Sequence, residues 1–320
     1  MLRYAVIGMG AVGGFYGIRL AGAGARVQFL VRHDTERVRA DGLHLRSPEG
    51  DVRLATPDVA ADWDELEPSD VLLVATKATA NDEVRARLAE HATRLLGPGG
   101  GILLAQNGIG AEPGFADAAP GREVLGGLAF LCSRRVGPGR IEHLDYGALT
   151  VAAHALGEQP AGITPLMEGI AADLRATGTE VILDEDLVRA RWRKLMWNIP
   201  FNPLSVILDA DTDVLVSDPS TVQLIGTVMA EVAAAAAAEG RDLPVGLAEL
   251  LLAATRRMAP YATSMKLDWD AGRPMEVDAL LGAPLLRAAR SGTAMPATTV
   301  LHQQLAFLDA RAQGGVQPAG

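Results

Sequence analysis

The chain has 320 residues and a formal net charge of −10, with 29 basic and 39 acidic side chains. Its hydrophobic content of 49% excludes intrinsic disorder, and at about 150 residues per domain its length allows one large domain or two ordinary ones. An acidic chain lacks the basic face that nucleic acids require, so we expect no nucleic-acid partner. The single cysteine excludes a disulfide framework and a cysteine-based zinc site.

The first half of the chain alternates short apolar runs with helical patterns, which predicts an α/β domain with a parallel sheet covered on both faces. The runs expected to form strands are Tyr4–Gly8, Val27–Val31, Val71–Thr76 and Gly101–Ala105. The helices expected between them are Gly13–Gly22, Thr35–Asp41 and Asn81–Leu96. Further β-like runs are Glu123–Leu131, Arg140–His143, Ala148–Ala153 and Glu180–Leu183, with a helix over Thr164–Thr177 before the last of them.

After residue 184 the pattern changes to long amphipathic stretches. These predict helices over residues 185–209, 219–240, 244–258, 276–291 and 297–311. We therefore expect a Rossmann-like N-terminal domain over residues 1–184, an all-α domain over residues 185–311 and a disordered tail over residues 312–320. No segment reaches the roughly 18 apolar residues needed to span a bilayer, and the N-terminus does not read as a signal peptide. We expect a cytoplasmic protein with no membrane partner.

A glycine-rich turn directly follows the first predicted strand and opens the first predicted helix. Its residues are Gly8, Met9, Gly10, Ala11, Val12 and Gly13, a G-x-G-x-x-G sequence. In such a turn the first glycine permits a tight bend, the second lets the backbone approach a pyrophosphate, and the third lets helix and strand pack closely. The anion lies at the positive N-terminus of the helix. The alternative is a merely flexible turn, but the flanking strand and helix favour a dinucleotide site.

The residues that follow the later strands indicate which dinucleotide binds and where. Arg32 stands 19 residues after Gly13, where an NAD-binding chain has an acid for the ribose 2′-hydroxyl. A guanidinium there suits the 2′-phosphate of NADP, so we favour NADP(H) over NAD as the cofactor. The alternative is that Arg32 is a solvated surface residue with no ligand. Lys77 and Asn107 each follow a predicted strand, at the edge where doubly wound sheets bind ligands. Both are candidates for cofactor contact, although a lysine in this place is often only a surface residue.

A polar strip marks the first helix predicted in the second half. Lys194, Asn198 and Asn202 recur every four residues, so they share one helix face among Trp, Met and Phe side chains. Pro200 and Pro203 are expected to disturb this helix and free carbonyl groups one turn earlier. The strip suits a pocket, and the alternative is a polar face on the domain surface.

A second cluster lies nearer the C-terminus. Ser264 offers a hydroxyl group, and Glu276 offers a carboxylate that could hold a hydroxyl of a cofactor or substrate. Each also fits a structural role, Ser264 as a helix N-cap and Glu276 as an acid in a first helical turn. The six histidines have no metal-binding spacing, and no histidine can be placed beside Cys132. We therefore predict neither a bound metal nor a cysteine nucleophile.

Taken together, these motifs resemble the ketopantoate reductase family, the 2-dehydropantoate 2-reductases. The resemblance covers roughly residues 1–310. Besides the glycine-rich turn, the motifs that carry it are Leu30-Val31-Arg32, Thr76-Lys77-Ala78, Gln106-Asn107-Gly108, the K-x-x-x-N-x-x-x-N-P stretch from Lys194 to Pro203, Thr263-Ser264-Met265 and Glu276-Val277-Asp278. It implies an NADP-dependent oxidoreductase that reduces a 2-oxo acid to a 2-hydroxy acid, with ketopantoate and pantothenate biosynthesis favoured. A helical second domain can form a dimer interface, so a homodimer is possible as well.

The resemblance implies a role for each candidate residue. Lys194 would be the general acid, because hydride addition to a ketone builds negative charge on its oxygen, which an ammonium stabilises and then protonates. The residues that would bind substrate are Asn107, Lys194, Asn198, Asn202 and Ser264. Those that would hold the cofactor are the glycine-rich turn Gly8–Gly13, Arg32, Lys77, Asn107 and Glu276.

The chain departs from the pantoate pattern at two positions. Thr212 stands where these enzymes tend to have a further asparagine, and Tyr261 stands where a histidine is common. Both lie near the substrate pocket that the resemblance implies. Two alternatives therefore stay open: a related oxidoreductase that acts on a different 2-oxo acid, and an NADP(H)-binding sensor without turnover. The retained Lys194 argues against the sensor, which needs no acid beside a nicotinamide.

Overall fold

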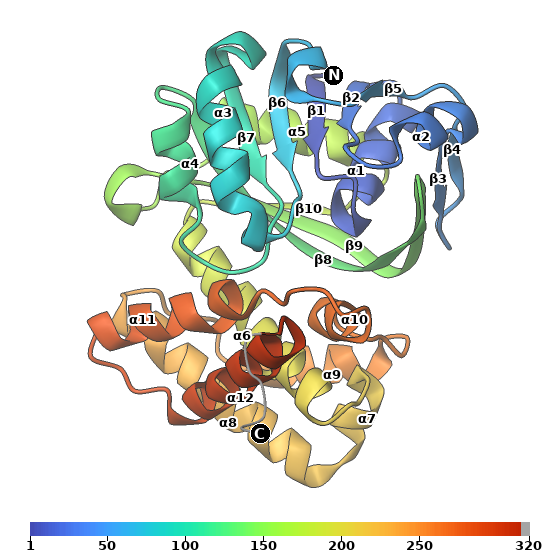
Figure 1. Cartoon of the computed structure of the whole chain (residues 1–320). Coiled ribbons are helices and arrows are strands. Elements are labelled where there is room, and N and C mark those ends of the chain that lie inside the picture. The colour runs from blue at the N-terminus through green and yellow to red at the C-terminus, as the bar shows by residue number, and fades with distance from the viewer. Residues whose placement is uncertain (315–320) are drawn as a thin grey trace. The chain divides into compact units, whose positions relative to one another are not determined.

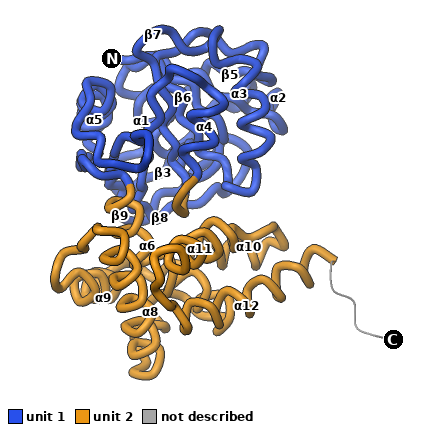
Figure 2. The backbone as a smooth tube through the Cα atoms, turned by 90° about the vertical axis from the view of Figure 1, so that its left-hand side faces the viewer, with its two compact units in different colours: residues 1–106, 111–187 blue, residues 107–110, 188–320 orange. Residues whose placement is uncertain are grey.

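The computed structural model describes residues 1–314, which divide into two compact units. Unit 1 comprises residues 1–106 and 111–187, and unit 2 comprises residues 107–110 and the chain from residue 188 onward (Figure 2). The sequence places a boundary near residue 184 and does not indicate that the short segment 107–110 groups with the helical unit. Of the predicted tail, residues 315–320 lie outside the described residues, and Ala312 is the last residue of a helix.

Unit 1 is built on a mixed sheet of ten strands within the described residues (Figure 1). The strands are β1 (Arg3–Ile7), β2 (Arg26–Leu30), β3 (Leu43–Arg46), β4 (Val52–Leu54), β5 (Asp58–Ala60), β6 (Ser69–Val74), β7 (Leu96–Leu104), β8 (Glu123–Gly137), β9 (Arg140–Ala153) and β10 (Val181–Asp184). They are ordered β4-β3-β9-β8-β7-β6-β1-β2-β5, with β10 paired to β9. The α/β class with an all-α second part is confirmed.

The parallel pairing predicted for the first four strand-forming runs is confirmed in β1, β2, β6 and β7, and antiparallel pairs occur only among the other strands of the described residues. The strands from β8 through β7, β6, β1 and β2 to β5 pair in parallel, but β8 and β9 are antiparallel, as are β3 and β4. The two β-like runs predicted at residues 140–143 and 148–153 form the single strand β9. Antiparallel strands need only a tight turn, and Gly139, with φ +64°, supplies it between β8 and β9.

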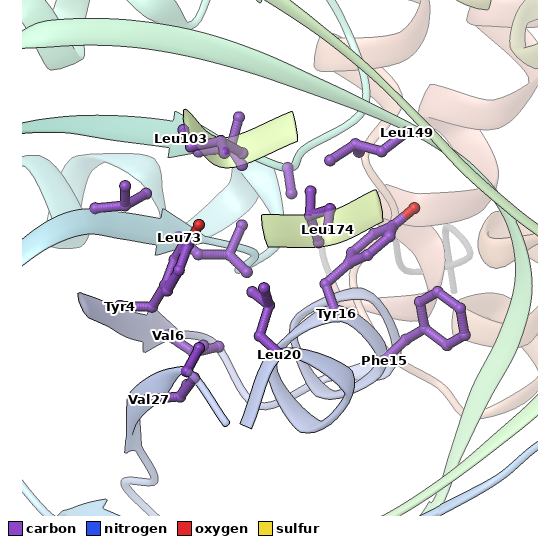
Figure 3. Packing of buried hydrophobic residues seen from close by; sticks show 14 of the residues in the cluster. Tyr4, Val6, Phe15, Tyr16, Leu20, Val27, Leu73, Leu103, Leu149 and Leu174 are labelled. Atoms are coloured by element: carbon purple, nitrogen blue, oxygen red, sulfur yellow. The ribbon is translucent and has the colours of Figure 1, made fainter. Parts of the chain in front are cut away.

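Helices cover both faces of this sheet. They are α1 (Ala11–Gly22), α2 (Thr35–Asp41), α3 (Asn81–Leu95), α4 (Glu112–Ala118) and α5 (Pro165–Ala176), with short 3₁₀ turns η1 (Trp63–Glu65), η2 (Ala78–Ala80) and η3 (Leu156–Glu158). Alternate residues of β1 enter two separate apolar clusters, Tyr4 and Val6 in one, Ala5 and Ile7 in the other. Figure 3 shows the first cluster, in which Tyr4 packs near Leu73. The Tyr4 hydroxyl donates to Asp173 on α5, 2.9 Å away, which ties the helix to the sheet.

Within the described residues, the regular elements of unit 2 are all helical. Its elements are α6 (Leu187–Ile207), α7 (Thr212–Ser217), α8 (Pro219–Ala238), α9 (Leu247–Arg257), α10 (Ser264–Asp270), the π-helical turn η4 (Asp278–Gly282), α11 (Ala283–Arg290) and α12 (Pro296–Ala312). The sequence does not predict the short helices α7 and α10. The helix predicted over residues 276–291 is divided into η4 and α11.

The expectation of no membrane partner stays a prediction. By length and composition alone, helix α8 is long and apolar enough to cross a membrane, a test that the core helices of soluble proteins also pass. The reason is its alanine-rich C-terminal half, which raises the hydropathy without adding large side chains. A third of the apolar window is buried, and the buried residues include Ile225, Met229 and Val232. Glu231 lies within this helix and accepts hydrogen bonds from Ala297 and Thr298 at the start of α12.

Glu231 caps α12, and its removal is expected to destabilise unit 2. Its Oε1 accepts the Ala297 N–H at 2.8 Å, and its Oε2 accepts the N–H of Thr298 at 2.9 Å and the hydroxyl of Thr298 at 2.8 Å. Because these donors would lose a charged acceptor, Glu231→Ala should lower the free energy of unfolding by about 3 kcal/mol. Urea unfolding measures the loss, with exposed Glu249→Ala as the control, for which about 0.5 kcal/mol or less is expected. Equal effects of the two changes would contradict the capping role.

Candidate active site

The glycine-rich turn has the geometry that a dinucleotide needs. Gly8 has φ +104°, and a Cβ there would lie 2.6 Å from the Thr76 nitrogen. A Cβ on Gly13 would lie 2.2 Å from the carbonyl oxygen of Gly8. At Gly10, by contrast, no atom of the described chain lies within 4 Å of the Cβ position. The protein itself therefore requires glycine at the first and third positions, whereas the second faces open space that a ligand could use.

The start of α1 supplies the charge that a phosphate prefers. Gly10 is the N-cap and offers no side-chain acceptor, and α1 begins at Ala11. The N–H groups of the first helical turn, which includes Val12 and Gly13, have no acceptor within the helix. They carry the positive end of the helix dipole, so this turn fits the pyrophosphate of a dinucleotide. Met9 is partly buried and packs against the first apolar cluster.

Two cationic side chains of unit 1 stand after the strands, as the sequence indicates. Arg32 follows β2 and forms an ion pair with Glu83 on α3, and both side chains are about half exposed. Lys77 follows β6, is exposed and precedes η2. The sequence gives no signal for the Arg32–Glu83 pair, because its partners lie on different elements. A 2′-phosphate placed beside Arg32 would compete with Glu83 for the guanidinium.

Buried Gln106 ties the ends of two parallel strands together. Its Nε2 donates to the Thr76 carbonyl at 3.0 Å and to Asn81 Oδ1 at 2.7 Å. Thr76 follows β6 and Asn81 opens α3, so one side chain bridges the edge of the sheet where ligands of such folds bind. These two hydrogen bonds fix the chain on both sides of Lys77, at Thr76 and at Asn81.

The polar strip of unit 2 lies on α6, which continues through Pro200 and Pro203 instead of breaking there. Asn198 and Asn202 are 2% and 1% exposed, whereas Lys194 is only partly buried. The Lys194 Nζ lies 5.8 Å from the centre of the Trp197 ring, within range of a cation–π interaction.

The Trp197 ring is itself held in place. Its Nε1 donates to Thr255 Oγ1 at 3.0 Å, and the ring stacks on Phe201 with centroids 4.9 Å apart. The ring that faces the ammonium of Lys194 is therefore fixed from two sides.

Asn107 and Asn198 are brought together within unit 2. Asn198 Nδ2 donates to Asn107 Oδ1 over 3.3 Å. The next residue, Gly108, has φ +96°, and a Cβ there would lie 2.5 Å from the Ala279 carbonyl of η4. The segment that carries Asn107 therefore packs on the turn that follows Glu276. Glu276 itself is buried and precedes the first helical residue of that turn.

Asn202 joins α6 to the start of α10. Its Nδ2 donates to the Asn198 carbonyl at 3.1 Å, and its Oδ1 accepts the Met265 N–H and the Ser264 hydroxyl, both at 3.4 Å. Ser264 is not the N-cap that the sequence allows, because Thr263 caps α10 by accepting the Lys266 N–H. This leaves Ser264 as the first helical residue, beside Asn202.

The two departures from the pantoate pattern contact each other. The Thr212 hydroxyl donates to the Tyr261 carbonyl at 3.2 Å, and both residues are buried. No group of three or more His, Cys, Asp and Glu side chains within residues 1–314 is arranged to hold a metal ion.

Comparison with known proteins identifies the family. The family model described as "Ketopantoate reductase PanE/ApbA" matches residues 4–155, and the model of the C-terminal part of the same family matches residues 186–309. The chain belongs to the ketopantoate reductase family. A 2-dehydropantoate 2-reductase from Nostoc sp. is 42% identical over 98% of this chain and 97% of its own length. The predicted resemblance is confirmed.

Solved structures agree with this family assignment. A 2-dehydropantoate 2-reductase from Geobacter metallireducens superposes with a TM-score of 0.88 at 36% identity, over 96% of this chain and 99% of that one. The one from Methylococcus capsulatus has a TM-score of 0.85 at 35% identity, over 97% and 98%. A D-mandelate dehydrogenase with NADH shares only the fold, at 20% identity and a TM-score of 0.84 over 97% and 99%. Ketopantoate reductases and a dehydrogenase of another 2-hydroxy acid thus share one architecture.

Proposed function

We propose that this member of the ketopantoate reductase family reduces 2-dehydropantoate to pantoate with NADPH. The observation that carries the proposal is the linked polar set of unit 2. In it Asn198 bonds to Asn107, Asn202 bonds to Ser264, and Lys194 lies on the same helix. The identity of 42% to a curated 2-dehydropantoate 2-reductase supports the substrate.

Unit 1 would hold the cofactor. The open space at Gly10 and the start of α1 suit the pyrophosphate, and Arg32 suits the 2′-phosphate. The proposed set of cofactor contacts also includes Lys77 of unit 1, and Asn107 and Glu276 of unit 2. When bound, the nicotinamide supplies the hydride that the ketone accepts.

Lys194 would act on the oxygen of the ketone. Its ammonium stabilises the negative charge that develops there and then donates a proton to form the hydroxyl group. The Trp197 ring lies within cation–π range of this ammonium, with 5.8 Å between Nζ and the ring centre.

Asn198, Asn202 and Ser264 would orient the substrate. Amide N–H groups and a hydroxyl can bind both a carboxylate and an alcohol, which are the polar groups of pantoate other than the reacting one. Asn198 and Asn202 are buried and Ser264 is partly buried, so little water competes for the two amide groups.

A different 2-oxo acid is the second candidate, favoured by Thr212 and Tyr261, the two buried residues that depart from the pantoate pattern. NADPH oxidation measured with a panel of 2-oxo acids, ketopantoate first, separates the two. We expect the highest kcat/KM with ketopantoate, and a higher value with another acid would transfer the proposal to that acid. If no acid of the panel is reduced, the proposed function fails and the sensor is favoured. The homodimer and the cytoplasmic location stay predictions.

Arg32 is expected to set the preference for NADPH over NADH. Arg32→Ala should lower kcat/KM for NADPH by about 10- to 100-fold and leave kcat/KM for NADH nearly unchanged. The reason is that only NADPH has a 2′-phosphate, which would lose a charged hydrogen bond to Arg32. Glu83→Gln is the matched control: it frees the guanidinium of its ion pair and should strengthen NADPH. Initial rates with both cofactors measure the effect. Equal kcat/KM values for NADPH and NADH in the wild type would contradict this role of Arg32.

A further inference from the structure

Two buried hydroxyl groups connect the polar strip of α6 to the start of α10. Ser205 and Thr263 are both 0% exposed, and their oxygens lie 2.7 Å apart. The Ser205 hydroxyl also lies 2.8 Å from the Asn202 carbonyl, and Thr263 Oγ1 lies 3.2 Å from the Lys266 nitrogen. Neither residue belongs to the predicted site.

The direction of these hydrogen bonds follows from counting hydrogens. Each hydroxyl has one hydrogen to donate. A carbonyl can only accept, so Ser205 donates to Asn202, and its own oxygen must accept from Thr263. Thr263 in turn accepts the Lys266 N–H. The chain therefore runs in one direction, from the α10 backbone through Thr263 and Ser205 to the α6 backbone.

This chain ends at the residue whose side chain also contacts α10. Asn202 Oδ1 accepts the Met265 N–H, and its Nδ2 donates to the Asn198 carbonyl. Because both partners are backbone groups with fixed roles, the amide has one orientation only. That orientation depends on where α10 stands relative to α6, which the two hydroxyl groups determine.

We propose that Ser205 and Thr263 are positioning residues that set Asn202 and Ser264 in the geometry that binds the substrate. The inference rests on the proposed function, since it assigns substrate contacts to Asn202 and Ser264. Neither hydroxyl touches the substrate. Their loss lets α10 shift, and displacements of about 1 Å at a binding group can cost roughly 100-fold in rate.

The test compares Thr263→Val, Ser205→Ala and the double variant. Each single change should lower kcat/KM for the 2-oxo acid by about 10- to 100-fold, mainly through KM, with unchanged NADPH affinity. Because either change breaks the same chain, the double variant should lose little more than one single variant. Thr263→Ser keeps the hydroxyl and should restore most of the wild-type KM. If Thr263→Val does not fold, Ser205→Ala, which keeps the cap of α10, carries the test.

Thr298→Val is the matched control, because Thr298 is also 0% exposed, lies in the first turn of α12 in unit 2 and donates its hydroxyl to Glu231. It should lower Tm without changing KM. The inference is overturned if Ser205→Ala and Thr263→Val lower Tm but leave KM at the wild-type value, or if their effects simply add. A wild type that reduces no 2-oxo acid overturns the proposed function, and this inference with it. An active wild type with unchanged variants overturns the inference alone.

Discussion

Lys194→Ala is expected to lower kcat for NADPH-dependent reduction of ketopantoate by about 10²- to 10⁴-fold, the usual contribution of a general acid. The affinity for NADPH should stay close to the wild-type value, because the proposed cofactor contacts lie elsewhere. The variant loses both the positive charge that stabilises the developing oxyanion and the proton that completes the hydroxyl. Steady-state rates and fluorescence titration with NADPH measure the two quantities separately.

The environment of Lys194 makes the fold tolerant of this change. The side chain is only partly buried, and its ring partner Trp197 is held independently by Thr255 and Phe201. A smaller residue at position 194 should therefore leave α6 in place and Tm little changed. A large loss of Tm would mean that the loss of rate reports unfolding and not chemistry.

Lys77→Ala is the matched control, since it removes the same ammonium from unit 1. It should weaken NADPH binding more than it lowers kcat at saturating NADPH, the reverse of Lys194→Ala. If Lys194→Ala instead weakens NADPH and keeps kcat, then Lys194 is a cofactor contact and the general acid is another group. If the wild type binds NADPH yet reduces no 2-oxo acid, the sensor alternative gains.

Gly10→Ala is expected to weaken NADPH binding by roughly 5- to 150-fold without lowering Tm. Gly10 has φ −89° and ψ −161°, a conformation that alanine adopts readily, so the backbone is not strained. The added methyl group meets no described protein atom within 4 Å, so it occupies only the open space proposed for the pyrophosphate. Overpacking at such a close approach costs about 1–3 kcal/mol of binding free energy. Fluorescence titration and thermal unfolding give the two values.

Gly13→Ala is the counterpart of this prediction, with the same methyl group in the same turn. Its Cβ would lie 2.2 Å from the Gly8 carbonyl oxygen and 3.0 Å from Ala75 Cβ. Helix α1 must therefore move away from the sheet, and unfolding free energy should fall by about 3 kcal/mol. A lower Tm for Gly10→Ala, or unchanged NADPH affinity, would show that Gly10 has a structural role and not the ligand role.

The sequence predicts features that depend on neighbouring residues. The spacing of the glycine-rich turn is typical of a strand-to-helix turn, and the four-residue spacing of Lys194, Asn198 and Asn202 is that of one helix face. The arrangement of each motif therefore follows directly from its spacing. Long apolar runs likewise indicate β1, β2, β6 and β7.

Features that depend on tertiary contacts escape this reasoning. The strands β3, β4 and β5 have only three or four residues each. Of these, β3 pairs with the distant β9 and β5 pairs with β2, while β4 pairs with β3 at the edge of the sheet. Ser205 and Thr263 lie 58 positions apart, so no spacing rule connects them. Thr263, not Ser264, caps α10, a choice between adjacent hydroxyl residues that composition does not decide.

The short segment 107–110 has a consequence for how the protein can be divided. It is flanked on both sides by unit 1, yet it packs on η4 through Gly108 and bonds to α6 through Asn107. The helical unit is therefore not a contiguous stretch of sequence, and expressing residues 188–320 alone would remove the partner of Asn198 and uncover Ala279. Exchange of this half between relatives has to carry the loop after β7 with it, so the two halves of a hybrid enzyme cannot be chosen independently at a single crossover point.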